Sequence, residues 1–262
     1  MMRQDCKTQY PIVLAHGLGF PDEGARPYWG RIPDVLRENG ARVYFGGQDA
    51  WGTIGGNARQ LAVAVRDAMR AESAARVNLI AHSKGGLEAR RLISSMGLGG
   101  CVASLSMLST PNRGAPMSEM LLRLHPGIEL WSAAAERGAR RRGDRHPSVL
   151  RAGREITAAA LARFNRENPD DSRVYYQSWG ARLNGLRADP LMDFSRRFVD
   201  RRAGEGSDGL VTPSSARWGR YRGTLEGVSH QMLADAFGRD IAGFDVRGFY
   251  TQLVHELAEM GF

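Results

Sequence analysis

The sequence predicts an α/β fold in which helices flank a mostly parallel central sheet. Short apolar segments alternate with segments of helical spacing from the start of the chain. Strands separated by helices of about 10 to 15 residues pair in parallel through right-handed crossovers. The apolar segments do not alternate with polar residues, which is typical of strands that helices cover on both faces. The 262 residues suffice for one large domain with a substantial core.

The first half of the chain supplies the expected core of this fold. Strands are expected at residues 11–15 and 42–45, in the run from 77 that ends at Ser83, and at 102–108. Helices are expected at residues 28–39, 57–72 and 86–96. The helix over 57–72 carries apolar side chains four residues apart, at Leu61, Val65 and Met69, which places them on one face.

The second half is less regular. Residues 117–150 mix apolar groups with arginines and predict an insertion. A helix is expected over about 154–168, where Pro169 ends it. Further expected elements are strands at 173–179, 210–212 and 224–228 and an amphipathic helix at 249–259. The chain contains no internal repeat or low-complexity linker, so residues 1–262 are expected to form one domain with one insertion.

The most informative segment is residues 77–87, which read V-N-L-I-A-H-S-K-G-G-L. An apolar strand that runs into a serine and then into a helix is typical of a nucleophile elbow, a sharp turn that exposes the serine hydroxyl. Small residues must flank the serine because the strand and helix backbones nearly touch, and here they are Ala81 and Gly85. Ser83 is therefore the candidate nucleophile, against the alternative of an ordinary strand-to-helix turn.

A serine nucleophile needs a base, and the base needs a carboxylate to orient it. On such a sheet the chain order is serine, acid, histidine, and His230 lies on a loop late in the chain. The other histidines precede or adjoin the elbow, lie in the insertion, or fall inside the last helix: His16, His82, His125, His146 and His255. Asp208, in the glycine-rich segment G-E-G-S-D-G-L-V, is the preferred acid, with Asp193 and Asp200 as competitors.

Two backbone N–H groups are needed to stabilise the oxyanion of an acyl-transfer intermediate. We expect one from Lys84, directly after the nucleophile, and one from Leu18 in the loop H-G-L-G after the first strand. Only the N–H of Lys84 is needed, so its side chain receives no role. The alternative interpretation of H-G-L-G is a glycine-rich connection without chemistry.

The net charge of +8 does not by itself indicate a nucleic-acid binder. The basic residues are two lysines, Lys7 and Lys84, and 34 arginines spread along the whole chain, which indicates a compositional bias. One cluster stands out: Arg137, Arg140, Arg141, Arg142, Arg145, Arg151 and Arg154. We interpret it as a solvated face, with contact to anionic lipid or acidic substrates as the alternative. It lacks the interleaved aromatic residues of single-strand binders, so nucleic acid is not an expected partner.

Several whole-chain features bear on the compartment. Cys6 and Cys101 are too few for a disulfide framework and are expected to be free thiols in a reducing environment. The sequence contains no run of about 18 apolar residues, so a membrane-spanning helix is not expected. The first ten residues lack the apolar region of a secretory signal. The expected location is the cytoplasm, or outside the cell if a signal has been removed.

Four segments together resemble the bacterial lipases and esterases of the α/β-hydrolase superfamily. They are Y-P-I-V-L-A-H-G-L-G, V-N-L-I-A-H-S-K-G-G-L, L-S-T-P-N-R-G-A and S-D-G-L-V. The resemblance implies an α/β-hydrolase fold, hydrolysis of carboxylic esters, a triad of Ser83, Asp208 and His230, and oxyanion donors at Leu18 and Lys84. In such lipases a helical lid follows the T-P-x-R-G segment, which here implies a lid at about residues 117–150. The chain departs from the commoner elbow at Ala81, as some lipase subfamilies do.

A second departure concerns calcium. Several of these lipases bind a structural calcium ion through an aspartate two residues after the catalytic histidine, where this chain has Met232. Asp193 and Asp235 could supply carboxylates, but a calcium site needs several oxygen ligands. No cofactor is therefore expected, and a structural calcium ion is the less favoured alternative.

The sequence thus predicts an esterase or lipase for apolar acyl esters that uses an acyl-enzyme on Ser83. The expected partners are a small-molecule or lipid ester and, transiently, a lipid surface met through the lid. Three other enzyme activities could use the same triad: a thioesterase, an amidase or a polyester depolymerase. A non-catalytic ligand-binding protein with a hydrolase fold is the alternative from another class.

Overall fold

Within the part of the chain that the structure describes, the central sheet has six strands, all of which run parallel. The computed structural model describes residues 5–24, 27–123, 127–184, 189–238, 240 and 243–262. The strands are β1 (Ile12–Ala15), β2 (Val43–Phe45), β3 (Val77–His82), β4 (Val102–Leu108), β5 (Tyr175–Arg182) and β6 (Arg220–Glu226), in the order β2-β1-β3-β4-β5-β6. The predicted fold class, an α/β fold with a mostly parallel sheet, is confirmed.

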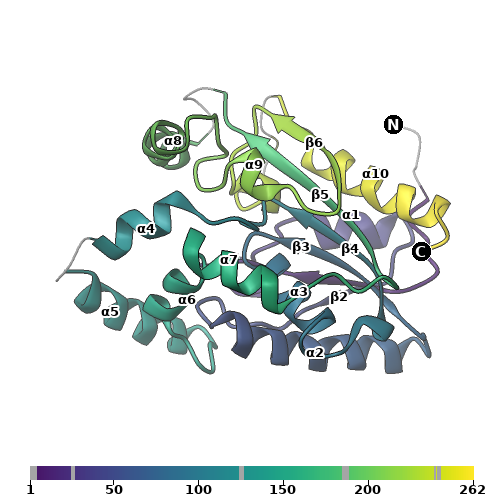
Figure 1. Cartoon of the computed structure of the whole chain (residues 1–262). Coiled ribbons are helices and arrows are strands. Elements are labelled where there is room, and N and C mark those ends of the chain that lie inside the picture. Colours follow the sequence, from purple (N-terminus) through teal and green to yellow (C-terminus); the bar gives the residue numbers. More distant parts are fainter. Residues whose placement is uncertain (1–4, 25–26, 124–126, 185–188, 239, 241–242) are drawn as a thin grey trace.

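Helices cover both faces of the sheet (Figure 1). Helices α2 (Ile54–Ala71) and α3 (Gly85–Ile93) pack on one face, whereas α1 (Ile32–Glu38) and α10 (Val246–Glu259) pack on the other. Along β1, Val13 belongs to the core under α2 and α3, and Ile12 and Leu14 belong to the core under α1 and α10. Both faces of the strand are buried, which explains why its sequence shows no polar alternation.

Several predicted boundaries were wrong, for local reasons. Helix α2 begins at Ile54, three residues earlier than expected, because the Thr53 side chain accepts a hydrogen bond from the Gly56 N–H and caps it. Residues 28–31 form a turn, and α1 begins only at Ile32. The helix expected over 154–168 is two helices, α6 (Val149–Glu155) and α7 (Ala158–Glu167), and Thr157 caps the second.

Other corrections fall late in the chain. Residues 210–212 are not a strand, because Thr212 instead caps the short helix α9 (Pro213–Ala216). Helix α8 (Pro190–Ala203) was not predicted, although Asp189 caps it and Pro190 opens it, two ordinary signals of a helix start. The remaining elements are the helices α4 (Pro116–Arg123) and α5 (Gly127–Arg141) and the 3-10 turns η1 (Gly99–Cys101) and η2 (Met232–Ala234).

The expected insertion at 117–150 contains most of α4, all of α5 and the start of α6. These helices lie together beside the carboxyl ends of the strands, and α4 also contacts α8 (Figure 1). Within the described ranges, no helix is long and apolar enough to cross a membrane. Cys6 and Cys101 are both free thiols, as expected. His125, named above as part of the insertion, lies outside the described residues.

The chain order of the sheet determines where a site can form. Strand β1 lies between β2 and β3, so the chain leaves β1 on one side of the sheet and later returns on the other. At such a switch point the loops after the two adjacent strands diverge and leave a crevice at their carboxyl ends. Here these two loops are H-G-L-G at 16–19 and the elbow at Ser83.

Candidate active site

Ser83 occupies a tight turn between β3 and α3. Its φ of 56° lies in the left-handed region, and its N–H donates to the Leu108 carbonyl at 2.9 Å. Close approach of the backbones explains the glycine two residues later, because a Cβ atom at Gly85 would lie 2.2 Å from the Ala15 carbonyl oxygen. Ala81 is fully buried in the sheet, which shows that its methyl group is accommodated. The sharp turn predicted for the elbow is therefore present.

His230 and Asp208 join Ser83 in one line of hydrogen bonds. The His230 Nε2 atom lies 2.9 Å from Ser83 Oγ, and its Nδ1 atom lies 2.7 Å from Asp208 Oδ2. Because a carboxylate only accepts hydrogen bonds, the neutral ring carries its proton on Nδ1 and presents a lone pair on Nε2 to the serine. This is the protonation state that a general base for Ser83 requires.

The competing acids are engaged elsewhere. Asp193 pairs with Arg196 and Arg197 on α8, at 2.7 and 3.1 Å. Asp200 accepts hydrogen bonds from Arg196 and from the Ser207 hydroxyl. The structure thus brings Asp208, and neither competitor, to His230.

The two predicted oxyanion donors flank Ser83. Leu18 lines the same cavity as Ser83 and His230, and Lys84 directly follows the serine at the start of α3. A Cβ atom at Gly17 would lie 2.6 Å from Ser83 Cβ, so the H-G-L-G loop runs directly against the serine. Among the hydrogen bonds of the described residues, neither the Leu18 N–H nor the Lys84 N–H is a donor, so both remain available to a ligand.

The Lys84 side chain does not point toward this oxyanion position as a free cation. It is 1% exposed and forms an ion pair with the fully buried Glu88 one turn later on α3. The Glu88 carboxylate also accepts hydrogen bonds from Gln48 and from Asn57. The four-residue spacing of Lys84 and Glu88 is that of a helical ion pair, but the sequence does not indicate that such a pair faces the core.

Two aromatic residues that the sequence did not indicate also support the site. The His82 ring lies 4.5 Å from that of His230 between centroids, and its Nδ1 atom bonds to the Tyr28 hydroxyl at 2.6 Å. Burial, with a smaller effect of His230, holds the pKa of His82 well below its usual value, so this ring stays neutral. Burial raises the pKa of the Tyr28 hydroxyl, which therefore stays protonated.

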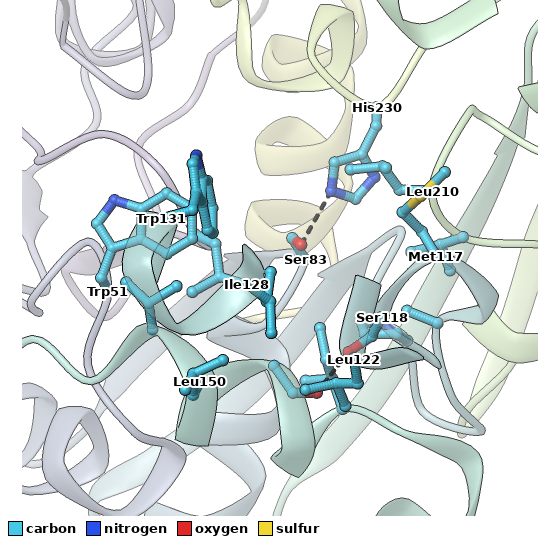
Figure 2. Close-up of a pocket in the computed structure, with 17 residues that line it drawn as sticks. Trp51, Ser83, Met117, Ser118, Leu122, Ile128, Trp131, Leu150, Leu210 and His230 are labelled. Atoms are coloured by element: carbon cyan, nitrogen blue, oxygen red, sulfur yellow. Dashed lines mark hydrogen bonds between the residues drawn. The ribbon is translucent and has the colours of Figure 1, made fainter. Parts of the chain in front are cut away.

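An apolar cavity of about 270 Å³ opens beside Ser83 (Figure 2). Trp51, Ile128, Trp131 and Leu150 lie around it, together with Met117 and Leu122, and the serine and histidine lie at one end. The Trp51 and Trp131 rings meet edge to face, with centroids 6.1 Å apart. The expected insertion therefore contributes much of the lining of this cavity.

A second cavity, of about 710 Å³, is also lined by His230. It shares Leu18, Leu210 and His230 with the first, and its lining includes the polar residues Arg31 and Gln231. The histidine thus lines both an apolar cavity and a more polar one.

The carboxylates named for calcium bind arginines instead. Asp193 pairs with Arg196 and Arg197, and Asp235 accepts three hydrogen bonds from Arg31. Met232, two residues after His230, is buried. Within the part of the chain that the structure describes, no three His, Cys, Asp or Glu residues form a group that could hold a metal ion.

Comparisons with known proteins find similarity to lipases. The chain is 31% identical over 252 residues to a triacylglycerol lipase of Pseudomonas fragi, covering 84% of this chain and 85% of the relative. It is 27% identical over 253 residues to triacylglycerol lipase 2 of Saccharomyces cerevisiae, covering 90% of this chain and 74% of the relative. Among solved structures, the lipase of Staphylococcus hyicus superposes with a TM-score of 0.76 at 16% identity, covering 98% of this chain and 97% of that one. No protein-family model matches the chain.

Proposed function

Since this chain belongs to the triacylglycerol lipase family and is a carboxylic ester hydrolase, we propose that it cleaves apolar acyl esters through an acyl-enzyme on Ser83. The observation that carries the proposal is the unbroken line of hydrogen bonds from Ser83 through His230 to Asp208. Each residue has the role that its contacts allow: Ser83 is the nucleophile, His230 the general base and then acid, and Asp208 the group that orients the imidazole.

Acylation begins when Ser83 Oγ attacks the ester carbonyl carbon while His230 Nε2 takes the hydroxyl proton. The imidazolium that results is stabilised by the Asp208 carboxylate at Nδ1. When the tetrahedral intermediate collapses, the bond to the alcohol oxygen breaks and His230 Nε2 returns its proton to that oxygen. The alcohol leaves, and the acyl group stays on Ser83 as an ester.

Deacylation repeats these steps with water. His230 takes a proton from a water molecule, whose oxygen attacks the acyl carbon. The intermediate then releases Ser83 Oγ, which recovers its proton from His230, and the carboxylic acid leaves. In both half-reactions the negative carbonyl oxygen faces the N–H groups of Leu18 and Lys84, and loss of one such donor typically costs about 3 kcal/mol of transition-state stabilisation.

We assign the acyl chain to the apolar cavity beside Ser83, because its lining is almost entirely hydrocarbon. The alcohol part of the ester then points past His230 toward the more polar cavity. In this arrangement the insertion at 117–150 is a lid, since Met117, Leu122, Ile128 and Trp131 come from it and line the acyl cavity.

The lid also carries the features of a lipid-facing surface. Leu130 is 80% and Trp131 50% exposed on α5, and the seven arginines of the cluster named above are exposed on α5, α6 and the loop between them. We propose a transient contact with anionic lipid. Vesicles containing phosphatidylglycerol should carry the protein upward in a flotation gradient at low salt; equal recovery with neutral vesicles would remove the charge-based part of the proposal.

Replacement of the nucleophile tests the function. Ser83→Ala should lower the kcat for p-nitrophenyl butyrate by roughly 10⁶-fold, as in other serine hydrolases, while its circular dichroism spectrum stays unchanged. Ser109→Ala is a matched control, because Ser109 also has a positive φ and is buried at the carboxyl end of the adjacent strand. It should keep near-normal activity. Ester hydrolysis retained by Ser83→Ala would overturn the proposal.

A further inference from the structure

Glu88 is a buried carboxylate directly behind the nucleophile elbow that takes part in none of these steps. It is fully buried on α3, where it accepts hydrogen bonds from the Lys84 ammonium, from the Gln48 amide and, at 2.9 Å, from Asn57 Nδ2. Removing two charges from water costs free energy unless close partners satisfy them. A well-packed apolar pair in place of the ion pair would stabilise the fold equally well. Stability alone therefore does not explain the cluster formed by Glu88 and its three hydrogen-bond donors.

The ion pair between Glu88 and Lys84 holds the residue whose backbone N–H is the first proposed oxyanion donor. Lys84 follows the nucleophile at the start of α3, and its side chain turns back along the helix to Glu88. Both parts of Lys84 are therefore constrained: its backbone by the peptide bond to Ser83, and its side chain by the ion pair with Glu88. This anchoring fixes the direction of an N–H that lies at the end of a helix, where backbone geometry frays most easily.

The hydrogen bond between Glu88 and Gln48 connects Glu88 to the loop that carries the second proposed donor, the Leu18 N–H. The Gln48 side-chain amide donates to Glu88, and the Gln48 backbone carbonyl oxygen lies 3.0 Å from Nε2 of the buried His16. His16 is itself the first residue of the H-G-L-G loop, so this contact reaches the loop directly. On the far side of Leu18, the Gly19 N–H donates to the Ala50 carbonyl at 3.1 Å. The loop after β2, residues 46–52, thus holds both ends of the H-G-L-G loop, and Glu88 anchors it.

We propose that Glu88 is a positioning residue that fixes both oxyanion donors at once, Lys84 through its ammonium and Leu18 through Gln48 and His16. The proposal rests on the function assigned above. Its physical basis is that an oxyanion hole works through preorganisation, since donors that already point at the developing charge need no reorganisation during the reaction. Donors on two separate loops keep their spacing only if the loops share a rigid support.

The variant Glu88→Gln tests this role, because an amide keeps the size of the side chain but cannot accept from three donors. We expect kcat for p-nitrophenyl butyrate to fall about 10- to 100-fold, less than for complete loss of one donor, while KM stays within about threefold because KM reports uniform binding. Glu256→Gln, which breaks the ion pair between Glu256 on α10 and Arg222 on β6, is the matched control and should leave both constants unchanged.

Two inhibitors separate positioning from general damage. Octylboronic acid adds to the serine hydroxyl and places a negatively charged oxygen in the oxyanion hole, whereas 1-octanol occupies only the apolar cavity. In Glu88→Gln the inhibition constant of the boronic acid should rise at least tenfold and that of octanol should not change. An unchanged constant for the boronic acid, or an equal rise for both inhibitors, would overturn the role of Glu88.

Two further results complete the test. If Glu88→Gln does not fold, Lys84→Met breaks the same ion pair from the other side, and the same pair of inhibition constants decides. If the boronic acid fails to inhibit the unmodified protein, the proposed function itself fails, which is a different outcome from equal inhibition of the unmodified protein and Glu88→Gln.

Discussion

At the scale of single residues, the turn that carries Asp208 prepares its carboxylate for one partner. Asp208 Oδ1 accepts hydrogen bonds from the N–H groups of Leu210 and Val211, at 2.9 and 2.8 Å, which leaves Oδ2 for His230. The Asp208 carbonyl also accepts from the His230 N–H at 2.9 Å. Acid and base are therefore held together by backbone as well as by side chain. The glycines around Asp208 made this turn recognisable in the sequence.

This arrangement predicts which aspartate matters. Asp208→Asn should reduce kcat by about 10⁴-fold, because an amide opposite Nδ1 favours the wrong tautomer of His230. Asp193→Asn, which disturbs only the pairs with Arg196 and Arg197, should stay within severalfold of the unmodified protein. Steady-state kinetics of the two variants on one ester decides, and a large loss in Asp193→Asn with activity retained in Asp208→Asn would reverse the assignment.

His82 predicts a dependence of stability on pH. Burial lowers the pKa of His82 in the folded state, whereas the unfolded chain takes up a proton on this residue below pH about 6.5. The contribution of neutral His82 is therefore complete above that pH and is lost as the pH falls, by about 1 kcal/mol per pH unit. In urea denaturation at pH 7 and pH 5, His82→Asn should lose less free energy of unfolding than the unmodified protein. Equal losses would show that His82 titrates normally in the fold.

At the scale of elements, the loop after β1 must pass very close to the elbow. A Cβ atom at Gly17 would lie 2.6 Å from both Ser83 Cβ and the Tyr28 hydroxyl. Gly17→Ala should therefore displace the Leu18 N–H and lower kcat by about 10²- to 10³-fold, the usual effect of losing an oxyanion donor. Gly100→Ala, where the new methyl group meets only the flexible Arg173 side chain, is the control. Near-normal kinetics of Gly17→Ala would argue against Leu18 as a donor.

The same elements show where prediction from the sequence ends. The strand–serine–helix and H-G-L-G patterns are local, so both could be recognised from residues close in the chain. The support of these loops is not local: Gln48, Asn57 and Glu88 come from three different segments. A second non-local contact joins the loop at 46–52 to the insertion. The Asp144 carboxylate accepts hydrogen bonds from the two N–H groups that follow Asp49, and the Asp49 carboxylate accepts from the two N–H groups that follow Asp144. Such pairs have no sequence pattern because folding alone brings them together.

At the scale of the whole molecule, the apolar runs of β1, β3 and β4 were enough to predict the parallel sheet, since burial on both faces leaves a simple signal. Boundaries depended on caps such as Thr53, Thr157 and Asp189 and were less accurate. The insertion was recognised only as irregular, because amphipathic helices that pack on one another over a cavity mix apolar and charged residues without a clear period.

The position of the insertion predicts the preference for substrates. If its helices form a lid over an apolar acyl cavity, activity should be maintained or rise from acetyl to octanoyl esters and should increase when tributyrin exceeds its solubility and forms an interface. Exposed Leu130 and Trp131 provide apolar surface for that interface. A series of p-nitrophenyl esters and a tributyrin titration measure this. A steady fall beyond acetyl with no increase at the interface would contradict the lid.

The central claim, an acyl-enzyme on Ser83, is tested most directly by mapping the covalent adduct of a fluorophosphonate with mass spectrometry. The account predicts one adduct on the peptide that contains Ser83, none on that peptide in Ser83→Ala, and much slower labelling in His230→Ala because the serine loses its base. An adduct on another residue, or equal labelling of Ser83→Ala, would contradict it.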